Sequence, residues 1–167
     1  MKAEHINPFI RSIDNALQSK LNMAPEGYAP YIKKEGLTSG DITGVIGFAD
    51  KDCRGAVALS FPKETAVIVF NAMVGNEDDK VNKITPKVQD TVGELANIVA
   101  DGARSEFSQA GITFSLAIPT VVLGRQHKIV QDIDAPIVVV PMKIDGHPFA
   151  MEICFKVNNN NGGNKDS

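Results

Sequence analysis

The sequence has few of the residues that build redox, metal or disulfide chemistry. It contains only two cysteines, Cys53 and Cys154, which lie about a hundred positions apart, and three histidines. Cysteines so far apart form neither a CxxC pair nor a disulfide framework, so we expect both to be small core or loop residues. His5, His127 and His147 have neither the HxxxH nor the HExxH spacing of metal ligands. The chain therefore predicts no metal site of its own.

A strong net charge and long apolar runs are absent as well. Lysine and arginine total 17 against 20 aspartates and glutamates, which leaves a net charge of −3 at pH 7. So small an imbalance argues against nucleic acid as a partner, because nucleic-acid-binding surfaces are basic. The sequence contains no run of about 18 uncharged apolar residues, which is the length needed to cross a membrane. Residues Met1 to His5 also lack the apolar stretch of a secretory signal. We therefore expect a cytoplasmic protein with no membrane partner.

The chain does have enough apolar residues for one core. Of its 167 residues, 43% are apolar, which predicts a single domain over residues 1–157. Residues 158–167 are rich in asparagine and glycine and have no apolar anchor. This composition predicts a disordered tail.

Three segments have apolar residues at the three- and four-residue spacing of a helix. The first covers residues 7–21, with Asn7 as a suitable N-cap and Pro8 in the first turn. The second covers residues 63–74 and is followed by a glycine. The longest covers residues 85–110 and starts with a Thr-Pro pair, in which the threonine can cap the helix.

Two β-hairpins are predicted from β-rich runs on either side of polar residues. Residues 42–61 turn through the polar segment 50–54, which predicts a loop longer than two residues. Residues 136–157 turn at residues 145–146, an Asp-Gly dipeptide favoured in tight turns. Further extended pieces are expected at residues 31–33, 113–123 and 128–133.

The two halves of the chain repeat one another in kind, because each contains a helix followed by a hairpin. Sequence identity between the halves is faint. We therefore predict an α+β fold of duplicated α-β-β units, with long helices packed on one face of a largely antiparallel sheet.

The longest helix has two opposite faces. At 100° per residue, with Val92 as zero, its apolar residues fall within about 60° of that direction. Asp90, Glu94, Asn97 and Asp101 fall on the other side, between about 140° and 200°. We expect the apolar stripe to face the sheet, and these four residues, called the polar row below, to face solvent or a partner.

Glu94 and Asn97 are three residues apart, so their side-chain heads can act on the same group. A carboxylate anchors a cation, and a carboxamide both donates and accepts hydrogen bonds, which is enough to hold and aim one water. Such a pair needs no nucleophile in its own chain. A solvated helix face has the same spacing, which also occurs from Glu4 to Asn7, so the spacing alone is not specific.

More specific is the combination of two motifs. Gly93-Glu94-Leu95-Ala96-Asn97 is followed, 22 positions after its last residue, by Pro119 in the segment 119–125. This combination resembles the CheC/CheX/FliY family of chemotaxis phosphatases, and its single well-formed motif is most similar to CheX. The resemblance extends loosely from the first helix to residue 157.

The resemblance implies a mechanism. Members of the family dephosphorylate the response regulator CheY, whose phosphoryl group sits on an aspartate beside a Mg²⁺ and a lysine of CheY. By resemblance, Glu94 would pair with that lysine, and Asn97 would align a water for in-line attack. Asp90, Gly93 and Asp101 would then contact the partner. No cofactor of its own is expected, because the Mg²⁺ belongs to the regulator.

The chain departs from the family pattern at two places. Relatives such as CheC carry a second E-x-x-N in the first helix, whereas this chain has serine in place of the glutamate in Ser12-Ile13-Asp14-Asn15. One competent site per chain is the simpler expectation. Asp101 stands where relatives usually carry a small residue, and its carboxylate would repel an incoming phosphoryl group by a modest amount.

The first interpretation is therefore a hydrolase acting on phosphorylated CheY. The alternative is a non-catalytic receiver-binding adaptor or a flagellar-switch-like module, and a small-molecule sensor ranks last. The resemblance also implies a homodimer in which sheets meet or exchange strands. Residues 136–140 could form such an edge or could equally be a buried central strand.

Overall fold

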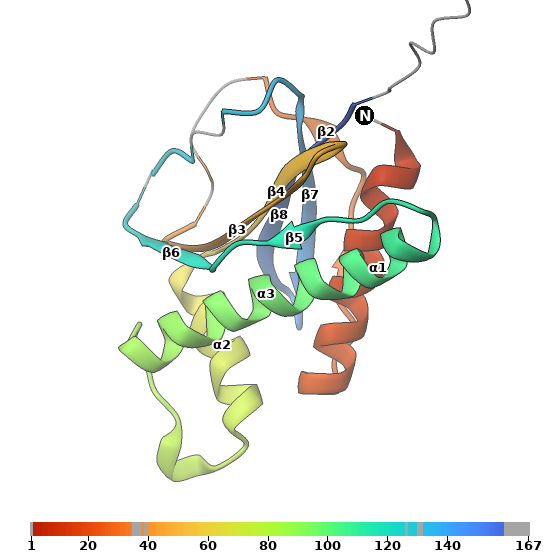
Figure 1. The fold of residues 1–167 in the computed structure, drawn as a ribbon. Coiled ribbons are helices and arrows are strands. Elements are labelled where there is room, and N and C mark those ends of the chain that lie inside the picture. Colours follow the sequence, from red (N-terminus) through yellow and green to blue (C-terminus); the bar gives the residue numbers. More distant parts are fainter. Residues whose placement is uncertain (1, 35–37, 39, 126, 130–131, 159–167) are drawn as a thin grey trace, which may run out of the picture.

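A single antiparallel sheet carries three α-helices on one face (Figure 1). The computed structural model describes residues 2–34, 38, 40–125, 127–129 and 132–158, and this arrangement refers to those residues. The helices are α1 (Ala3–Leu21), α2 (Lys63–Val74) and α3 (Pro86–Gln109), with a short 3-10 turn at Glu77–Asp79. The strands are β1 (Glu26–Gly27), β2 (Tyr31–Ile32), β3 (Ile42–Asp50), β4 (Cys53–Phe61), β5 (Ser115–Leu116), β6 (Thr120–Leu123), β7 (Ile137–Ile144) and β8 (His147–Val157).

The strand order confirms the predicted fold class. The order is β1-β7-β8-β4-β3-β5, with β2 also pairing with β7 and β6 also pairing with β3. The pairings between described strands are antiparallel, and the two long hairpins meet where β4 lies beside β8, with Val57 opposite Ile153. Each half of the chain thus contributes one hairpin to the centre of the sheet, as expected of duplicated α-β-β units.

The position of β7 decides between the two alternatives for residues 136–140. β7 pairs with β8 on one side and with β1 and β2 on the other, so Val139 lies opposite both Glu152 and Tyr31. A strand hydrogen-bonded on both sides has no free edge for another chain. Residues 137–140 therefore belong to an internal strand, and the sheet edges are formed by other segments.

Both long hairpins turn through two residues, and one of them differs from its prediction. In the β3–β4 hairpin Asp50 lies opposite Cys53, so the loop has only two residues and the predicted longer loop was wrong. The pairing extends this far because Cys53 is buried and its thiol lies 3.6 Å from the Thr113 carbonyl oxygen. In the β7–β8 hairpin Asp145 (φ 49°) and Gly146 (φ 75°) form the predicted tight turn.

The first helix begins four residues earlier than predicted. Its N-cap is Lys2, so Asn7 is not the cap and Pro8 lies inside the helix. The extra turn is stabilised by burial, because the His5 ring packs edge-on against Phe155 with the ring centroids 5.1 Å apart. This contact compensates for the stability lost because Pro8 has no backbone N–H to donate within the helix. Burial also lowers the pKa of His5.

The other two helices match their predictions. α2 ends at Gly75, whose φ of 65° allows the left-handed cap. α3 is capped by Thr85, whose hydroxyl oxygen accepts a hydrogen bond from the Val88 amide at 3.3 Å. The apolar stripe was predicted to consist of Val88, Val92, Leu95, Ala96, Val99, Ala103, Phe107 and Ala110. All of these residues are buried except Ala110, which is exposed beyond the end of the helix.

The chain after α3 is less regular than predicted. The extended segment 113–123 is divided into β5 and β6, which both pair with β3 and form an edge of the sheet. Residues 128–129 and 132–133 form no strand, and residues 130–131 lie outside the described residues. The predicted tail also lies outside them, apart from Asn158.

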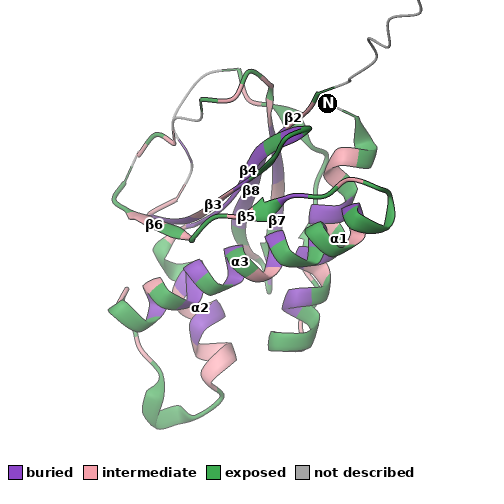
Figure 2. Ribbon diagram, in the orientation of Figure 1, coloured by how far each residue is buried: buried purple, intermediate pink, exposed green. Residues whose placement is uncertain are grey.

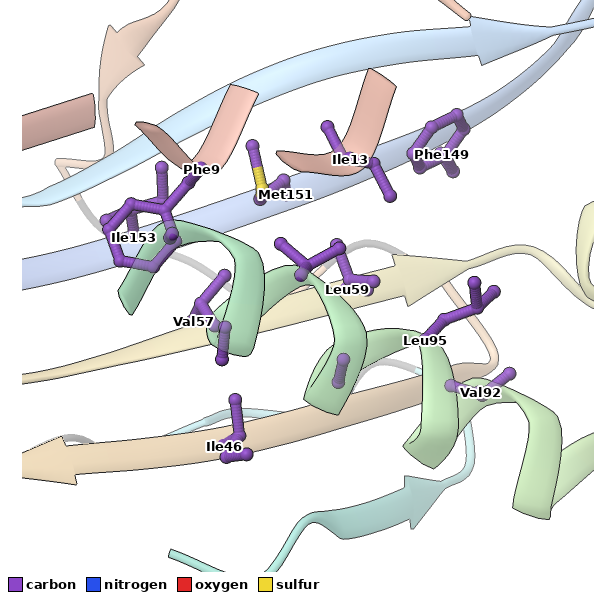
Figure 3. Close-up of a cluster of buried hydrophobic side chains, with 14 of the residues drawn as sticks. Phe9, Ile13, Ile46, Val57, Leu59, Val92, Leu95, Phe149, Met151 and Ile153 are labelled. Atoms are coloured by element: carbon purple, nitrogen blue, oxygen red, sulfur yellow. The ribbon is translucent and has the colours of Figure 1, made fainter. Parts of the chain in front are cut away.

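The core lies between the helices and the sheet (Figure 2). Each large side chain buried there contributes roughly 1.5–3 kcal/mol of stability, so the helices that supply several of them are firmly seated. Figure 3 shows this layer, with residues from α1 (Phe9, Ile13), α3 (Val92, Leu95) and the strands (Ile46, Val57, Leu59, Phe149, Met151, Ile153).

Candidate functional site

The polar row lies on the outer face of α3. Asp90, Glu94, Asn97 and Asp101 are all exposed, whereas the residues between them on the inner face are buried in the core. Because α3 is 24 residues long and is packed against both α1 and the sheet, the row projects from a rigid element. Figure 2 shows α3 with its buried side toward the sheet and its exposed side outward.

Gly93 has a different place from the one predicted. It was expected to contact a partner, but it is buried beneath the chain's own edge strand. A Cβ added at Gly93 would lie 3.2 Å from Val121 Cγ2 and 3.9 Å from Pro119 Cβ. The glycine therefore lets β6 and the residue before it approach the helix closely. The two motifs found in the sequence are in contact with each other here.

A second glycine fixes α3 from the sheet side. A Cβ on Gly44 of β3 would lie 2.7 Å from the Val92 carbonyl oxygen and 3.2 Å from Ala96 Cβ. Such close approach of backbone to backbone leaves no room for a side chain. Gly44 on one side and the 119–121 segment on the other thus fix the turn of α3 from which Glu94 and Asn97 project.

Asp101 has a partner that was not predicted from the sequence. Its carboxylate forms an ion pair with the guanidinium of Arg104, three residues later on the same helix. Both side chains are about half exposed, so solvent also screens the carboxylate. The spacing of three residues could have revealed this pair. The repulsion that Asp101 would exert on a phosphoryl group is reduced accordingly.

The cysteines lie in the core, as predicted. Cys53 and Cys154 are both buried and free, and burial raises the pKa of each thiol. They therefore remain protonated near neutral pH, which makes them poor nucleophiles. Within the described residues there is no group of three or more histidine, cysteine, aspartate or glutamate side chains that could hold a metal ion. No helix in the described part of the chain has the length and apolar character needed to cross a membrane.

A buried polar cluster on the opposite face of the sheet was not foreseen from the sequence. Glu152 of β8 is only 2% exposed, and the Lys33 ammonium donates to its carboxylate at 3.1 Å. Nearby, the Thr43 hydroxyl oxygen lies 2.9 Å from that of Ser60 and 2.6 Å from His127 Nε2. These groups satisfy one another, as buried polar groups must. The cluster is therefore explained by the stability of this face rather than by a ligand.

Comparisons with known proteins agree on one family. A family model described as chemotaxis phosphatase CheX matches residues 42–143, a range that includes the polar row and Pro119. The CheY-P phosphatase CheX of Thermotoga maritima is 28% identical over 129 residues, which cover 77% of this chain and 81% of that protein.

Solved structures show the same fold. The crystal structure of a CheC-like superfamily protein from Shewanella sp. PV-4 matches with a TM-score of 0.85 and 33% identity, over 93% of this chain and 99% of that one. CheX in the CheX-CheY-BeF3-Mg²⁺ complex from Borrelia burgdorferi matches with a TM-score of 0.75 over 91% and 97% of the two chains. At 20% identity the second match concerns the fold alone.

Proposed function

The chain belongs to the CheX family of chemotaxis phosphatases, and from that premise we propose that it accelerates hydrolysis of the aspartyl phosphate on a CheY-type response regulator. The observation that most supports the proposal is the exposure of Glu94 and Asn97 together on the outer face of α3. A pair that acts inside another protein's active site must project from a rigid element, and α3 is held by contacts on both sides.

In the proposed mechanism Asn97 enters the regulator's site and positions the attacking water. Its carboxamide oxygen accepts a hydrogen bond from the water and its amide group donates one to a phosphoryl oxygen. The water is then aligned for in-line attack on phosphorus, opposite the aspartyl oxygen that leaves. An acyl phosphate is already reactive, so orientation and charge neutralisation are sufficient for rate enhancement.

The acidic residues of the polar row would lie against the partner, where Glu94 is the one expected to attract it. Glu94 is proposed to pair with the lysine beside the regulator's phosphorylation site, and Asp90 and Asp101 to contact the surface around it. A carboxylate at the rim of an interface mainly affects the association rate and its dependence on salt. Gly93 contributes indirectly, by allowing the edge strand to lie against the helix.

Any metal ion in the reaction is proposed to belong to the regulator. The Borrelia burgdorferi complex contains CheY, beryllium fluoride and Mg²⁺, and beryllium fluoride bound to a carboxylate stands in for a phosphoryl group. In such a site the Mg²⁺ neutralises charge on the phosphoryl oxygens, and the residues of this chain supply the water's position.

The test is the decay of a phosphorylated receiver domain with and without this protein, repeated for several receivers. We expect a catalytic amount of the protein to accelerate phosphate release from at least one of them. A non-catalytic adaptor would bind the same receiver, activated with beryllium fluoride, and leave the decay rate unchanged. That result would overturn the enzymatic proposal in favour of the adaptor.

We also propose that the protein is a cytoplasmic homodimer. Because β7 is internal in the described sheet, a dimer through the sheet would use one of its edges, formed by β1 with β2 or by β5 with β6. Size-exclusion chromatography with light scattering measures the mass. A monomeric mass across the micromolar range would contradict the dimer without affecting the proposed chemistry.

A further inference from the structure

Ile118 lies on the surface in an unusual way for an isoleucine. It is 88% exposed, the highest value among the large apolar residues that the structure describes as exposed. Single exposed apolar residues are common on protein surfaces and by themselves need no explanation. What distinguishes Ile118 is the way in which the chain holds it and the residues next to it.

The residues on both sides of Ile118 are fixed to the rest of the fold. The amide of Ala117 donates to the Gly47 carbonyl of β3 at 2.8 Å. Pro119 lies over Gly93 of α3, 3.9 Å from where a Cβ would be. Ile118 therefore stands between an attachment to the sheet and an attachment to the helix, and its own side chain points to solvent. A side chain presented from so constrained a backbone loses little further entropy when a partner covers it.

This position is next to the polar row. Around the axis of α3, Gly93 lies about 40° from Asn97 and about 100° from Glu94, at 100° per residue. Pro119 packs over Gly93 on this side of α3. Ile118, the residue before it, therefore lies on the same flank of the helix as Asn97. Figure 1 shows the segment that joins β5 and β6 running alongside α3.

We propose that Ile118 is a docking residue for the receiver domain, which it contacts through an apolar recess beside the phosphorylation site. The inference rests on the proposed function, because a receiver that admits Asn97 must also approach the flank on which Ile118 stands. Ile118 then determines which receivers bind: those with an apolar recess at this place gain affinity, and those with a charge there lose it.

The experiment measures how the initial rate of receiver dephosphorylation depends on receiver concentration. Ile118→Ser is expected to raise the half-saturating receiver concentration about tenfold and to leave the rate at saturation within about twofold, because burial of an isoleucine contributes binding but no chemistry. Ile118→Leu should restore most of the affinity. Ile32→Ser is the matched control, since Ile32 is 59% exposed on β2 at the opposite edge of the sheet, and it should change neither quantity.

The outcomes separate this inference from the proposed function. An unchanged half-saturating concentration for Ile118→Ser, with an active wild type, would overturn the docking role and leave the phosphatase intact. If the wild type does not accelerate decay, the phosphatase proposal fails, and the docking role is then tested by titration with a beryllium-fluoride-activated receiver. About tenfold weaker binding of Ile118→Ser than of the wild type supports the docking role. Equal binding of the two proteins overturns it. A variant that becomes monomeric with unchanged receiver affinity would assign Ile118 to a contact between two copies of this chain, which also overturns the proposal.

Discussion

The two long helices on the same face of the sheet, α1 and α3, use their outer surfaces differently. On α3, Glu94 and Asn97 are both exposed. At the corresponding spacing on α1, Asn15 is exposed but Ser12 is buried, with its hydroxyl 3.5 Å from the Ile98 carbonyl oxygen. The two helices pack against each other at Ser12. On α1, only the asparagine of the Glu-Asn pair is therefore present and exposed.

The reason for the difference lies in the contact between the helices. A Cβ on Gly102 of α3 would collide with the Ser12 side chain, so glycine and serine together set how closely the helices approach. Arg11 and Glu106 form an ion pair across the same boundary. A functional face on a helix thus requires a side that no neighbouring element covers. On α1, part of the corresponding side is buried against α3.

The largest effect is expected when the two asparagines are compared directly. Asn97→Ala should lower the rate of receiver dephosphorylation at saturation by about a hundredfold or more, because the water loses its orientation. Asn15→Ala, an identical change on the exposed side of α1, should leave the rate unchanged. Binding of the activated receiver should survive both substitutions. Equal rates for the two variants would show that α3 is not the catalytic helix.

Restoring the missing glutamate on α1 should damage the fold rather than create a second site. Ser12→Glu places a longer, charged side chain at a position that is only 8% exposed and already in tight contact with Gly102, so the two helices must move apart to accommodate it. We expect a loss of about 2–4 kcal/mol in the free energy of unfolding, measured with urea. Ser19→Glu, at an exposed position of the same helix, is the control and should change stability by less than about 0.5 kcal/mol. A stable Ser12→Glu variant with increased activity would show that the helices can separate here.

Much of the fold could be predicted from local sequence. Apolar periodicity, Gly75 and the Thr85-Pro86 start were sufficient for α2 and α3, because each signal lies within the element that it defines. The start of α1 could not be found in this way. Its first turn is stabilised by packing of His5 on Phe155, 150 positions away, and no local pattern reports such a contact.

In the candidate site, too, features with a local sequence signal could be predicted, and features that depend on distant contacts could not. The exposure of Glu94 and Asn97 followed from helix periodicity, and the structure agrees. The burial of Gly93 under Val121 could not be predicted, because it depends on where the edge strand returns after α3. The exposure of Ile118 could not be predicted for a related reason, since an isoleucine in a β-rich run is normally interpreted as a core residue. The roles of Glu94 and Asn97 in catalysis remain predictions.

Charge on the outer face of α3 should affect association more than chemistry. Glu94→Lys would replace the proposed attraction for the regulator's lysine with a repulsion, so the half-saturating receiver concentration should rise about tenfold or more at low salt. Glu94→Gln should cause a smaller rise, and both effects should shrink as ionic strength increases. Glu26→Lys makes the same charge change on exposed β1 and should leave the value unchanged. If Glu94→Lys instead lowered only the rate at saturation, Glu94 would belong to the chemical step.

The smallest effect is expected from the ion pair between Asp101 and Arg104, one turn beyond Asn97. Arg104→Ala leaves the carboxylate without its cation, so an incoming phosphoryl group is repelled more strongly and the half-saturating concentration should rise about twofold. Asp101→Asn removes the negative charge and should lower that concentration by a similar factor. In the double variant the effect of Arg104→Ala should disappear, because the charge that the arginine neutralised is gone. If Arg104→Ala has the same effect with and without Asp101, the arginine contacts the partner directly and the pairing on α3 does not tune the site.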